Sequence, residues 1–360
     1  MTLTATFPVH KTALSRISEV DFDQLEFGKY VSDHMLVSDY NAANPEGNGW
    51  DTPEIIPFSN ISLSPTTLAL HYGQTVFEGM KAFRMADGRI NIFRLDRHYN
   101  RFVKSLDRMC MAIVPREIFM EGLMQLIELD KDWVPKAAGH ALYIRPFMIA
   151  TEARFGVKIS DEYRFMIFTG PVPSLYTEPI KVKVETAYVR AARGGTGSAK
   201  CGGNYGGAYL PTRQARLEGY DQVLWTGGKD NMFIEESGMM NVMFVIDGKL
   251  VTPPLSDSIL DGVTRDSLLT LAKDLGYITE ERPVAIAELE AAFKAGTITE
   301  AFGAGTAAVV APIKTIQING IDHSLPAYGA SSIQNILKNE LEQIRTGIKA
   351  DLHEWNFIIQ

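Results

Sequence analysis

The chain has 360 residues, of which 46% are hydrophobic, and its 35 basic and 43 acidic residues give a formal net charge of −8. A chain of this length can bury large cores and is typical of two domains. The acidic balance argues against nucleic acids and anionic membranes as partners. Only two cysteines are present, Cys110 and Cys201, so no disulfide framework is expected and a reducing compartment is favoured.

No segment of the sequence predicts a membrane span or a secretion signal. Apolar runs stay well short of the ~20 residues that cross a bilayer, and residues 1–20 lack the apolar core of a signal peptide. We therefore expect a cytoplasmic protein without a membrane partner. The histidines are scattered without the spacing of metal ligands, so we expect no metal site.

The first half of the chain predicts a domain of mixed α and β structure, residues 1–170. Residues 1–30 show little periodicity and predict an extended arm, and Asp87-Gly88 is a hairpin signal. Helical spacing of apolar residues predicts helices at 95–110 and 116–129. Extended segments are predicted at 33–39, 66–77, 82–92, 140–149 and 163–169.

Three prolines between residues 170 and 179 mark the expected domain boundary. Proline keeps a segment extended and out of regular pairing, so we expect an interdomain linker at 171–180 and a second domain at 181–360. Gly276 is expected to end one of its helices, and Asp247-Gly248 is a hairpin signal. The predicted strands lie at 180–189, 222–225 and 241–246, and the predicted helices lie at 210–218, 263–275, 287–294 and 331–345.

A glycine-rich stretch from Arg190 to Gly207 contains one lysine, Lys200. Glycine lets the backbone pass close to a ligand, which suggests a small-molecule site. A phosphate-binding P-loop would end in Gly-Lys-Ser/Thr, but Ala199 and Cys201 flank this lysine, so a nucleotide site is disfavoured. A lysine in a partly desolvated pocket has a lowered pKa and can form a Schiff base with an aldehyde or ketone. The alternative is an ordinary solvated loop lysine.

Several short motifs follow one another along the chain. They are Asp33-His34-Met35-Leu36, Phe77-Glu78-Gly79-Met80-Lys81, Lys200-Cys201-Gly202-Gly203-Asn204-Tyr205, Glu236-Ser237-Gly238-Met239-Met240-Asn241, Gly262-Val263-Thr264-Arg265 and Gly303-Ala304-Gly305-Thr306-Ala307. In this order they resemble the motifs of branched-chain amino acid aminotransferases, which are pyridoxal-phosphate enzymes of fold type IV. The resemblance covers nearly the whole chain. It implies a mixed α/β fold of two domains with largely antiparallel sheets, of which the second is barrel-like and flanked by helices.

The resemblance implies that pyridoxal 5′-phosphate is bound covalently to Lys200. Lys200 would then be the catalytic residue, which carries the proton between substrate and cofactor. Glu236, rather than Glu235, would face the pyridine nitrogen and keep it protonated. Tyr205 would contact the ring oxygen of the cofactor. The phosphate would be held by Arg101, by the helix start at Val263 and Thr264, and by Thr306.

The resemblance also implies a substrate pocket with an apolar and aromatic wall. Its residues are Tyr72, Phe77, Tyr143, Arg145, Val31, Val157, Thr306 and Ala307. The main-chain amides of Thr306 and Ala307 would hold the α-carboxylate, and Arg145 is a candidate for the distal carboxylate of glutamate. Val31 stands where relatives often have an aromatic residue, which predicts a looser pocket. Each apolar member could instead be an ordinary core residue.

These inferences predict reversible transamination of L-leucine, L-isoleucine and L-valine with 2-oxoglutarate, giving branched-chain 2-oxo acids and L-glutamate. The mechanism expected from the resemblance is ping-pong, through a pyridoxamine form of the cofactor, in a homodimer whose first domain helps to close the partner's pocket. The alternative on the same scaffold is a D-amino-acid aminotransferase, an aminodeoxychorismate lyase or an amine transaminase. A catalytically silent ligand-binding protein is disfavoured by the joint presence of Lys200 and Glu236.

Overall fold

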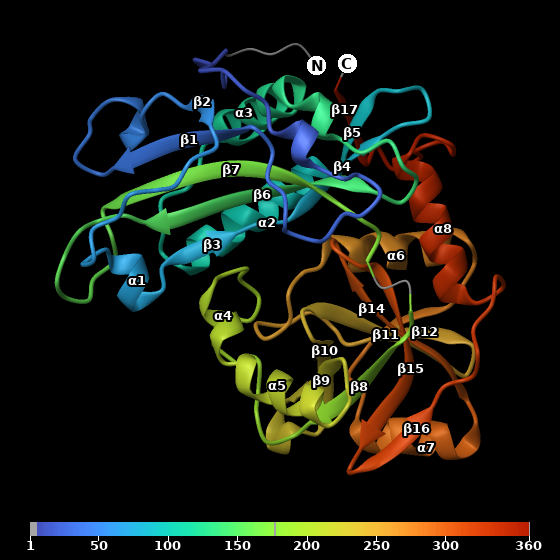
Figure 1. Ribbon diagram of the computed structural model, residues 1–360. Coiled ribbons are helices and arrows are strands. Elements are labelled where there is room, and N and C mark those ends of the chain that lie inside the picture. The colour runs from blue at the N-terminus through green and yellow to red at the C-terminus, as the bar shows by residue number, and fades with distance from the viewer. Residues whose placement is uncertain (1–5, 176–177, 360) are drawn as a thin grey trace. The chain divides into compact units, whose positions relative to one another are not determined.

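A computed structural model describes residues 6–175 and 178–359 (Figure 1). The chain divides into two compact units. Unit 1 consists of Met1–Ser174, Ala199–Gly203 and Ile344–Gln360, and unit 2 consists of Leu175–Ser198 and Asn204–Gln343. Two segments expected in the second domain, the one around Lys200 and the C-terminal one, thus have their contacts in unit 1. In the expected linker, Tyr176 and Thr177 lie outside the described residues.

Unit 1 is built on an eight-stranded sheet with the order β17-β5-β4-β6-β7-β1-β2, in which β3 pairs with β6. Its described strand pairs are antiparallel. The strands are β1 (His34–Asn41), β2 (Glu54–Pro57), β3 (Thr75–Phe77), β4 (Met80–Arg84), β5 (Ile90–Phe93), β6 (Ala141–Ala150), β7 (Glu162–Val172) and β17 (Asn356–Ile359). The hairpin predicted at Asp87-Gly88 is confirmed, because β4 and β5 pair with Ala82 opposite Ile92.

Two helices pack on this sheet, α2 (Leu95–Arg108) and α3 (Arg116–Leu129), as Figure 1 shows. Their apolar faces bury Phe102 and Phe119 in one core with Phe165 of β7. The Phe165 ring centroid lies 5.7 Å from that of Phe102 and 5.9 Å from that of Phe119. Both helices were predicted from their periodicity. Because the core fixes α2 against the sheet, the polar side chains of α2 also have fixed positions relative to β3 and β6.

The extended segment predicted at 66–77 is wrong in its first part. Residues Leu68–Tyr72 form a short helix, α1, and only Thr75–Phe77 form a strand. Gly73 ends the helix in the left-handed region, at φ 72°. The alternating apolar residues are not the buried face of a strand, because Leu70 is 61% exposed.

Asp33, at the start of the first motif, holds the N-terminal arm. It accepts hydrogen bonds from the Ser15 hydroxyl at 2.5 Å, the Arg16 amide at 2.8 Å and the Trp133 indole at 3.0 Å. The arm otherwise has little regular structure, apart from a 3₁₀ turn at Ile17–Glu19. The first motif therefore has a structural role in unit 1, since it ties an irregular segment to the folded sheet.

Unit 2 contains a nine-stranded sheet with the order β10-β9-β8-β15-β14-β11-β12-β13, in which β16 pairs with β15. β10 also pairs with β11, so the sheet closes on itself as a barrel. β8 runs parallel to β9 and to β15. The strands are β8 (Ile180–Glu185), β9 (Gln222–Gly227), β10 (Phe233–Ser237), β11 (Met240–Ile246), β12 (Lys249–Thr252), β13 (Thr279–Glu281), β14 (Ile298–Gly305), β15 (Val309–Ile318) and β16 (Ile321–Ser324).

Helices flank this barrel. The helices of the second half of the chain are α4 (Gly203–Gly206), α5 (Tyr209–Leu217), α6 (Val263–Asp274), α7 (Ile286–Ala295) and α8 (Ile333–Arg345). α5 contacts β9, and α6 and α7 contact β14. Gly276 follows α6 with φ 81°, as predicted. The expected mixed α/β fold with a barrel-like second sheet is confirmed. Within the described residues, every helix is too short or too polar to cross a bilayer.

Candidate active site

Lys200 lies in a short segment whose backbone is tied to β3 and α2. The Phe77 amide donates to the Lys200 carbonyl at 3.0 Å, and the Lys200 amide donates to Ser105 Oγ at 2.9 Å. Two residues later, the Gly202 amide donates to the Thr75 carbonyl at 3.1 Å. These contacts fix the lysine on elements of unit 1, although it belongs to the glycine-rich stretch of the second half of the sequence.

The Lys200 side chain is partly buried, and its amine lies 4.9 Å from the centroid of the Phe77 ring. Burial lowers the pKa of the Lys200 amine, the positive charge of Arg101 lowers it further, and the Glu78 carboxylate opposes the change. The neutral amine, the form of a lysine that can act as a nucleophile or a base, is therefore favoured at a lower pH than in an exposed lysine. An ordinary solvated loop lysine does not have these surroundings.

Arg101 projects from α2 and is only 6% exposed. Its Nε lies 2.8 Å from Glu78 Oε2, and its Nη2 lies 2.5 Å from Glu78 Oε1. Ser105, one turn further along α2, donates to the Arg101 carbonyl at 3.0 Å and accepts the hydrogen bond from the Lys200 amide. One stretch of α2 therefore carries a buried guanidinium and holds the lysine segment.

A hollow of about 280 Å³ in unit 1 brings three of the predicted substrate residues together. It is lined by the N-terminal arm, β6 and β7, with Phe27, Tyr30, Val31, Tyr143, Arg145 and Phe168 among its residues. Phe27, which the sequence did not single out, packs edge-on against Tyr143 with ring centroids 5.1 Å apart. The sequence carried no signal for Phe27, because an aromatic residue in an irregular arm has no periodicity.

Arg145 lies between aromatic rings in this hollow. Its guanidinium carbon is 4.7 Å from the Phe77 ring centroid and 5.2 Å from that of Tyr143, and its Nη2 donates to the Tyr143 hydroxyl at 3.1 Å. Its Nε is buried and has no hydrogen-bond partner among the described residues. Gly79 allows this arrangement, because a Cβ there would lie 2.0 Å from the Tyr143 hydroxyl. The hollow thus combines aromatic walls with a positive hydrogen-bond donor.

Two other predicted substrate residues lie outside this hollow. Tyr72 is on α1 and is 46% exposed, and Val157, in the connection between β6 and β7, is 79% exposed. Phe155 and Ile159 in the same connection are 93% and 58% exposed. The β6–β7 connection, residues 151–161, therefore presents apolar side chains to solvent in the single chain.

Glu236 lies on β10 and is 3% exposed, with its carboxylate held from three sides. Its Oε1 accepts hydrogen bonds from Asn241 Nδ2 at 3.2 Å and from the Leu260 amide at 3.0 Å. Its Oε2 forms an ion pair with Arg190 Nε at 2.7 Å. Neither Arg190 nor Leu260 was singled out for this role from the sequence, because both are distant from Glu236 along the chain.

The neighbouring Glu235 is in a different environment. Burial raises the pKa of its carboxyl, and its Oε1 accepts a hydrogen bond from Ser258 Oγ at 2.6 Å. A carboxyl with a raised pKa is protonated more often than one that accepts hydrogen bonds from N–H groups and pairs with an arginine. The geometry therefore favours Glu236 over Glu235 as the buried anion of unit 2.

Asn241 links Glu236 to the start of α6. Its Nδ2 donates to Glu236, and its Oδ1 packs against Gly262, where a Cβ would lie 1.9 Å away. α6 begins at the next residue, Val263, and no side chain caps it. The first amides of the helix, including that of Thr264, have no partner within the helix, and helix starts of this kind are able to bind anions.

Thr306 and Ala307 lie in the turn between β14 and β15. β11 and β14 pair with Asn241 opposite Ala304, so this turn is at the same end of the barrel as Asn241. Unit 2 thus gathers a buried carboxylate, a helix start and this turn at one end of its sheet. Tyr205 lies on the short helix α4 in the glycine-rich stretch.

Within the glycine-rich stretch, Gly197 serves the packing of the chain itself. At Gly197 a Cβ would lie 2.5 Å from the Ser258 carbonyl, so only glycine fits between the two backbones. Arg190, which pairs with Glu236, donates through Nη2 to the Gly197 carbonyl at 3.3 Å. The sequence suggested a close approach to a ligand, but at this position the close approach is to neighbouring backbone.

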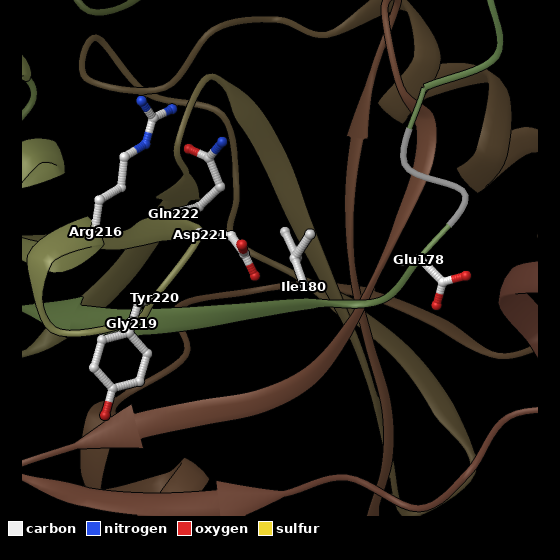
Figure 2. A pocket seen from close by; sticks show the side chains of 7 residues that line it. All are labelled: Glu178, Ile180, Arg216, Gly219, Tyr220, Asp221 and Gln222. Carbon is white, nitrogen blue, oxygen red and sulfur yellow. The ribbon is translucent and has the colours of Figure 1, made fainter.

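A second hollow, of about 650 Å³, lies in unit 2 beside the start of β8 and the end of α5 (Figure 2). Figure 2 shows that Arg216, Tyr220 and Glu178 point in different directions rather than toward a common centre. The Tyr220 hydroxyl donates to Asp322 at 2.7 Å. None of the predicted site residues lines this hollow, and we assign no ligand to it.

The sequence and the fold were compared with those of known proteins. Residues 75–316 match the family model described as amino-transferase class IV. Branched-chain-amino-acid transaminase 1 from Bacillus subtilis (strain 168) is 47% identical over 304 residues, which are 83% of this chain and 84% of the relative. A crystal structure of the Escherichia coli branched-chain amino acid aminotransferase has a TM-score of 0.72 and 25% identity, and covers 85% of this chain and 97% of its own. A crystal structure of the Thermobaculum terrenum branched-chain amino acid aminotransferase in its PLP form has a TM-score of 0.72 and 23% identity. It covers 91% of this chain and 98% of its own.

The matched residues 75–316 include every motif from Phe77 to Ala307 on which the sequence resemblance depends. The solved structures agree with the mixed α/β fold and its closed second sheet. Because the family model matches more than half of the residues, and the Bacillus subtilis relative is similar over most of both chains, this chain belongs to the class IV aminotransferases and, within them, to the branched-chain-amino-acid aminotransferases.

Proposed function

We propose that this enzyme transfers the amino group of L-leucine, L-isoleucine and L-valine reversibly to 2-oxoglutarate, by a ping-pong mechanism. The observation that carries the proposal is the Lys200 amine over the Phe77 ring, with a pKa lowered by burial and by Arg101. The 47% identity to a branched-chain-amino-acid transaminase supports the choice of substrates. The products would be branched-chain 2-oxo acids and L-glutamate.

Pyridoxal 5′-phosphate is the cofactor of this family, and the residues of each unit fit it separately. When bound, it withdraws electrons from Cα of the substrate and so weakens the bond that breaks there. In unit 1, a lysine with a lowered pKa could react with the aldehyde of the cofactor, and the buried Arg101 could bind its phosphate. In unit 2, the buried carboxylate of Glu236 could pair with a protonated ring nitrogen, and the amides at the start of α6 could bind the phosphate. The residues that would hold the cofactor are Lys200, Arg101, Tyr205, Glu236, Val263, Thr264 and Thr306.

Lys200 would also move the proton. With its pKa lowered, the Nζ of Lys200 is more often neutral near pH 7 than an exposed lysine, so it can accept the proton from Cα of the amino acid. The backbone hydrogen bonds to Phe77 and Ser105 keep the lysine segment in place during this transfer. The Phe77 ring lies against one side of the amine and would limit the access of water.

The hollow in unit 1 supports a pocket that accepts both kinds of substrate. Its walls at Val31, Tyr143 and Phe27 suit a branched aliphatic side chain. Arg145, whose buried Nε has no hydrogen-bond partner within residues 6–175 and 178–359, would hold the distal carboxylate of glutamate or 2-oxoglutarate. The amides of Thr306 and Ala307 would hold the α-carboxylate, with Tyr72 and Phe77 as further wall residues.

We also infer a homodimer, in a cytoplasmic setting. The exposed apolar side chains of Phe155, Val157 and Ile159 support a second copy that covers the β6–β7 connection. Val157 would then line the partner's pocket rather than its own. The cysteines Cys110 and Cys201 are unpaired, which agrees with a reducing compartment.

Absorption spectroscopy tests the proposal directly. The visible absorption of the cofactor-loaded enzyme should change when L-leucine alone is added. After L-leucine has been removed, it should return when 2-oxoglutarate alone is added. Lys200→Ala should show neither change. Steady-state rates with D-alanine and aminodeoxychorismate separate the alternative activities of the scaffold, and a higher rate with either than with L-leucine would overturn the proposed substrates. If Lys200→Ala behaved like the wild type, the assignment of the lysine would be abandoned.

A further inference from the structure

Glu78 forms a fully buried ion pair that the proposed function leaves unexplained. It lies between β3 and β4 with no exposed surface. Its Oε2 contacts Arg101 Nε at 2.8 Å, and its Oε1 contacts Arg101 Nη2 at 2.5 Å. Oε1 also accepts a hydrogen bond from the Gly79 amide at 2.7 Å and lies 3.3 Å from His98 Nδ1. Each carboxylate oxygen therefore has a defined partner.

The opposite charges of Glu78 and Arg101 balance each other. Burial opposes ionisation of Glu78, but the charge of Arg101 and the hydrogen bonds from His98 and Arg101 hold the pKa of that carboxyl well below its usual range. Burial lowers the pKa of His98, which favours the neutral imidazole, and the tautomer with a hydrogen on Nδ1 can donate to Glu78. The ion pair itself joins one carboxylate and one guanidinium, whose two charges cancel.

The pairing fixes the orientation of Arg101. A guanidinium is planar, and two parallel contacts to one carboxylate define its plane. Both contacts to Glu78 use the edge formed by Nε and Nη2, so the Nη1 edge is directed to the opposite side. Buried ion pairs contribute little net stability compared with apolar side chains, so a role in orientation accounts better for the presence of this one.

Glu78 also connects Arg101 to Lys200 through adjacent residues of the backbone. The Phe77 amide holds the Lys200 carbonyl at 3.0 Å, and the next side chain, Glu78, holds Arg101. The Glu78 amide is itself anchored to the Pro146 carbonyl on β6 at 2.8 Å. The backbone of Lys200 and the guanidinium of Arg101 are therefore both tied to two adjacent residues, Phe77 and Glu78. A rigid cofactor with an aldehyde at one position and a phosphate at another needs both groups at a fixed separation.

We propose that Glu78 is a positioning residue, which orients Arg101 toward the cofactor phosphate at a fixed distance from Lys200. This inference depends on the proposed function, because it takes Arg101 as the phosphate ligand. It adds that the specificity for a phosphorylated cofactor over its unphosphorylated form comes from the orientation of Arg101 as well as from its charge.

Comparison of pyridoxal 5′-phosphate with pyridoxal tests this inference. Both compounds carry the same aldehyde, and only one carries the phosphate that Arg101 would bind. Glu78→Asp keeps the charge but shortens the side chain by one methylene, so the two parallel contacts cannot both persist. Dissociation constants would be measured by absorbance titration of cofactor-free protein. Glu121→Asp on α3, at a residue that is 6% exposed, is the matched control for shortening a buried glutamate.

Glu78→Asp should weaken the binding of pyridoxal 5′-phosphate about tenfold while changing the binding of pyridoxal less than about twofold. Arg101→Lys keeps the positive charge but lacks the parallel N–H donors of the guanidinium. It should show the same selective loss. The double variant should be no weaker than Arg101→Lys alone, because Glu78 acts through Arg101. Equal losses for both compounds in Glu78→Asp, or losses that add up in the double variant, would overturn the inference.

The outcomes also separate this inference from the proposed function. If Arg101→Lys leaves the preference for the phosphate intact, the assignment of Arg101 fails. If Arg101→Lys loses the preference and Glu78→Asp keeps it, only the role of Glu78 fails.

Hydrogen exchange tests the pairing in the unsubstituted protein, so the inference does not depend on the folding of a variant. The Nε–H of Arg101 in cofactor-free wild type, assigned by its disappearance in Arg101→Lys, should exchange at least about 100-fold more slowly than that of an exposed arginine. Exchange at the exposed rate would show that Glu78 does not fix the guanidinium.

Discussion

The groups around Lys200 in unit 1 and around Glu236 in unit 2 are built differently. Lys200 is held by backbone hydrogen bonds, lies over an aromatic ring and has a balanced ion pair nearby. Glu236 is held by side-chain and backbone donors from three separate segments and is close in sequence to Asn241, which contacts the start of α6. The first arrangement lowers the pKa of an amine, whereas the second holds a buried carboxylate between fixed donors.

This difference predicts different consequences of substitution. Loss of a reactive atom cannot be replaced by neighbouring groups, so changes at Lys200 should be the most severe. Loss of a fixed charge weakens stabilisation of the developing charge and leaves the reaction path intact, so changes at Glu236 should be graded.

Lys200→Ala should lower kcat by at least about 10³-fold, because both the proposed covalent link and the proposed base would be lost. Single-turnover rates with L-leucine and cofactor-loaded protein measure this. Lys294→Ala, at an exposed lysine on α7, is the matched control and should leave kcat unchanged. A loss smaller than about tenfold in Lys200→Ala would remove the distinction between the two groups of residues.

Glu236→Gln should lower kcat about 10²-fold and leave the dissociation constant of L-leucine nearly unchanged, since a buried anion is lost without a change in shape. Glu235→Gln is the control on the same strand, and we expect less than a threefold effect, since burial already raises the pKa of this carboxyl. Steady-state kinetics of both variants give the comparison. Equal effects of the two substitutions would contradict the choice of Glu236.

Gly79→Ala should raise the KM for L-leucine about tenfold, because a Cβ would lie 2.0 Å from the Tyr143 hydroxyl and push it into the hollow. The free energy of unfolding should also fall by about 1–3 kcal/mol through overpacking. Gly329→Ala, where a Cβ meets nothing within 4 Å, is the control. Urea unfolding and steady-state rates test both effects. An unchanged KM in Gly79→Ala would show that Tyr143 can move without cost to the pocket.

The sequence predicted several elements from the spacing of their apolar residues or from a neighbouring turn signal. α2 and α3 each have one apolar face, so their periodicity was visible. β14 and β15 were not predicted. Nearly every residue of Ile298–Gly305 and Val309–Ile318 is buried, so no alternation marks these strands, although the fully buried β11 was predicted. Residues 68–72 alternate without being a strand, and only the left-handed Gly73 shows that a helix ends there.

For the candidate site, the sequence indicated residue types and their order but not their partners. Lys200 and Glu236 could be named from motifs, since the chemistry of each requires a particular side chain. Phe27, Arg190 and Glu78 acquire their contacts only through folding, because each partner is far away in the sequence or lies in an irregular segment. Tertiary contacts of this kind leave no periodic signal in a single sequence.

Asp33→Asn should have the smallest effect on catalysis and should act mainly on stability. Burial raises the pKa of the Asp33 carboxyl, but hydrogen bonds from the Arg16 amide, Ser15 and Trp133 outweigh it and lower the pKa. A depressed pKa in the folded state contributes stability above the unfolded value of about 3.9, and this contribution is lost as the pH falls through the folded value.

The free energy of unfolding of Asp33→Asn should therefore be about 1–3 kcal/mol lower than that of the wild type at pH 7, and the difference should shrink below about pH 4. Urea unfolding at pH 7, 5 and 3 measures it. Asp87→Asn is the control, because Asp87 pairs with Arg89 at the surface, where ion pairs contribute little. A difference for Asp33→Asn that stayed constant from pH 7 to pH 3 would mean that the shape of the side chain, rather than its charge, holds the N-terminal arm.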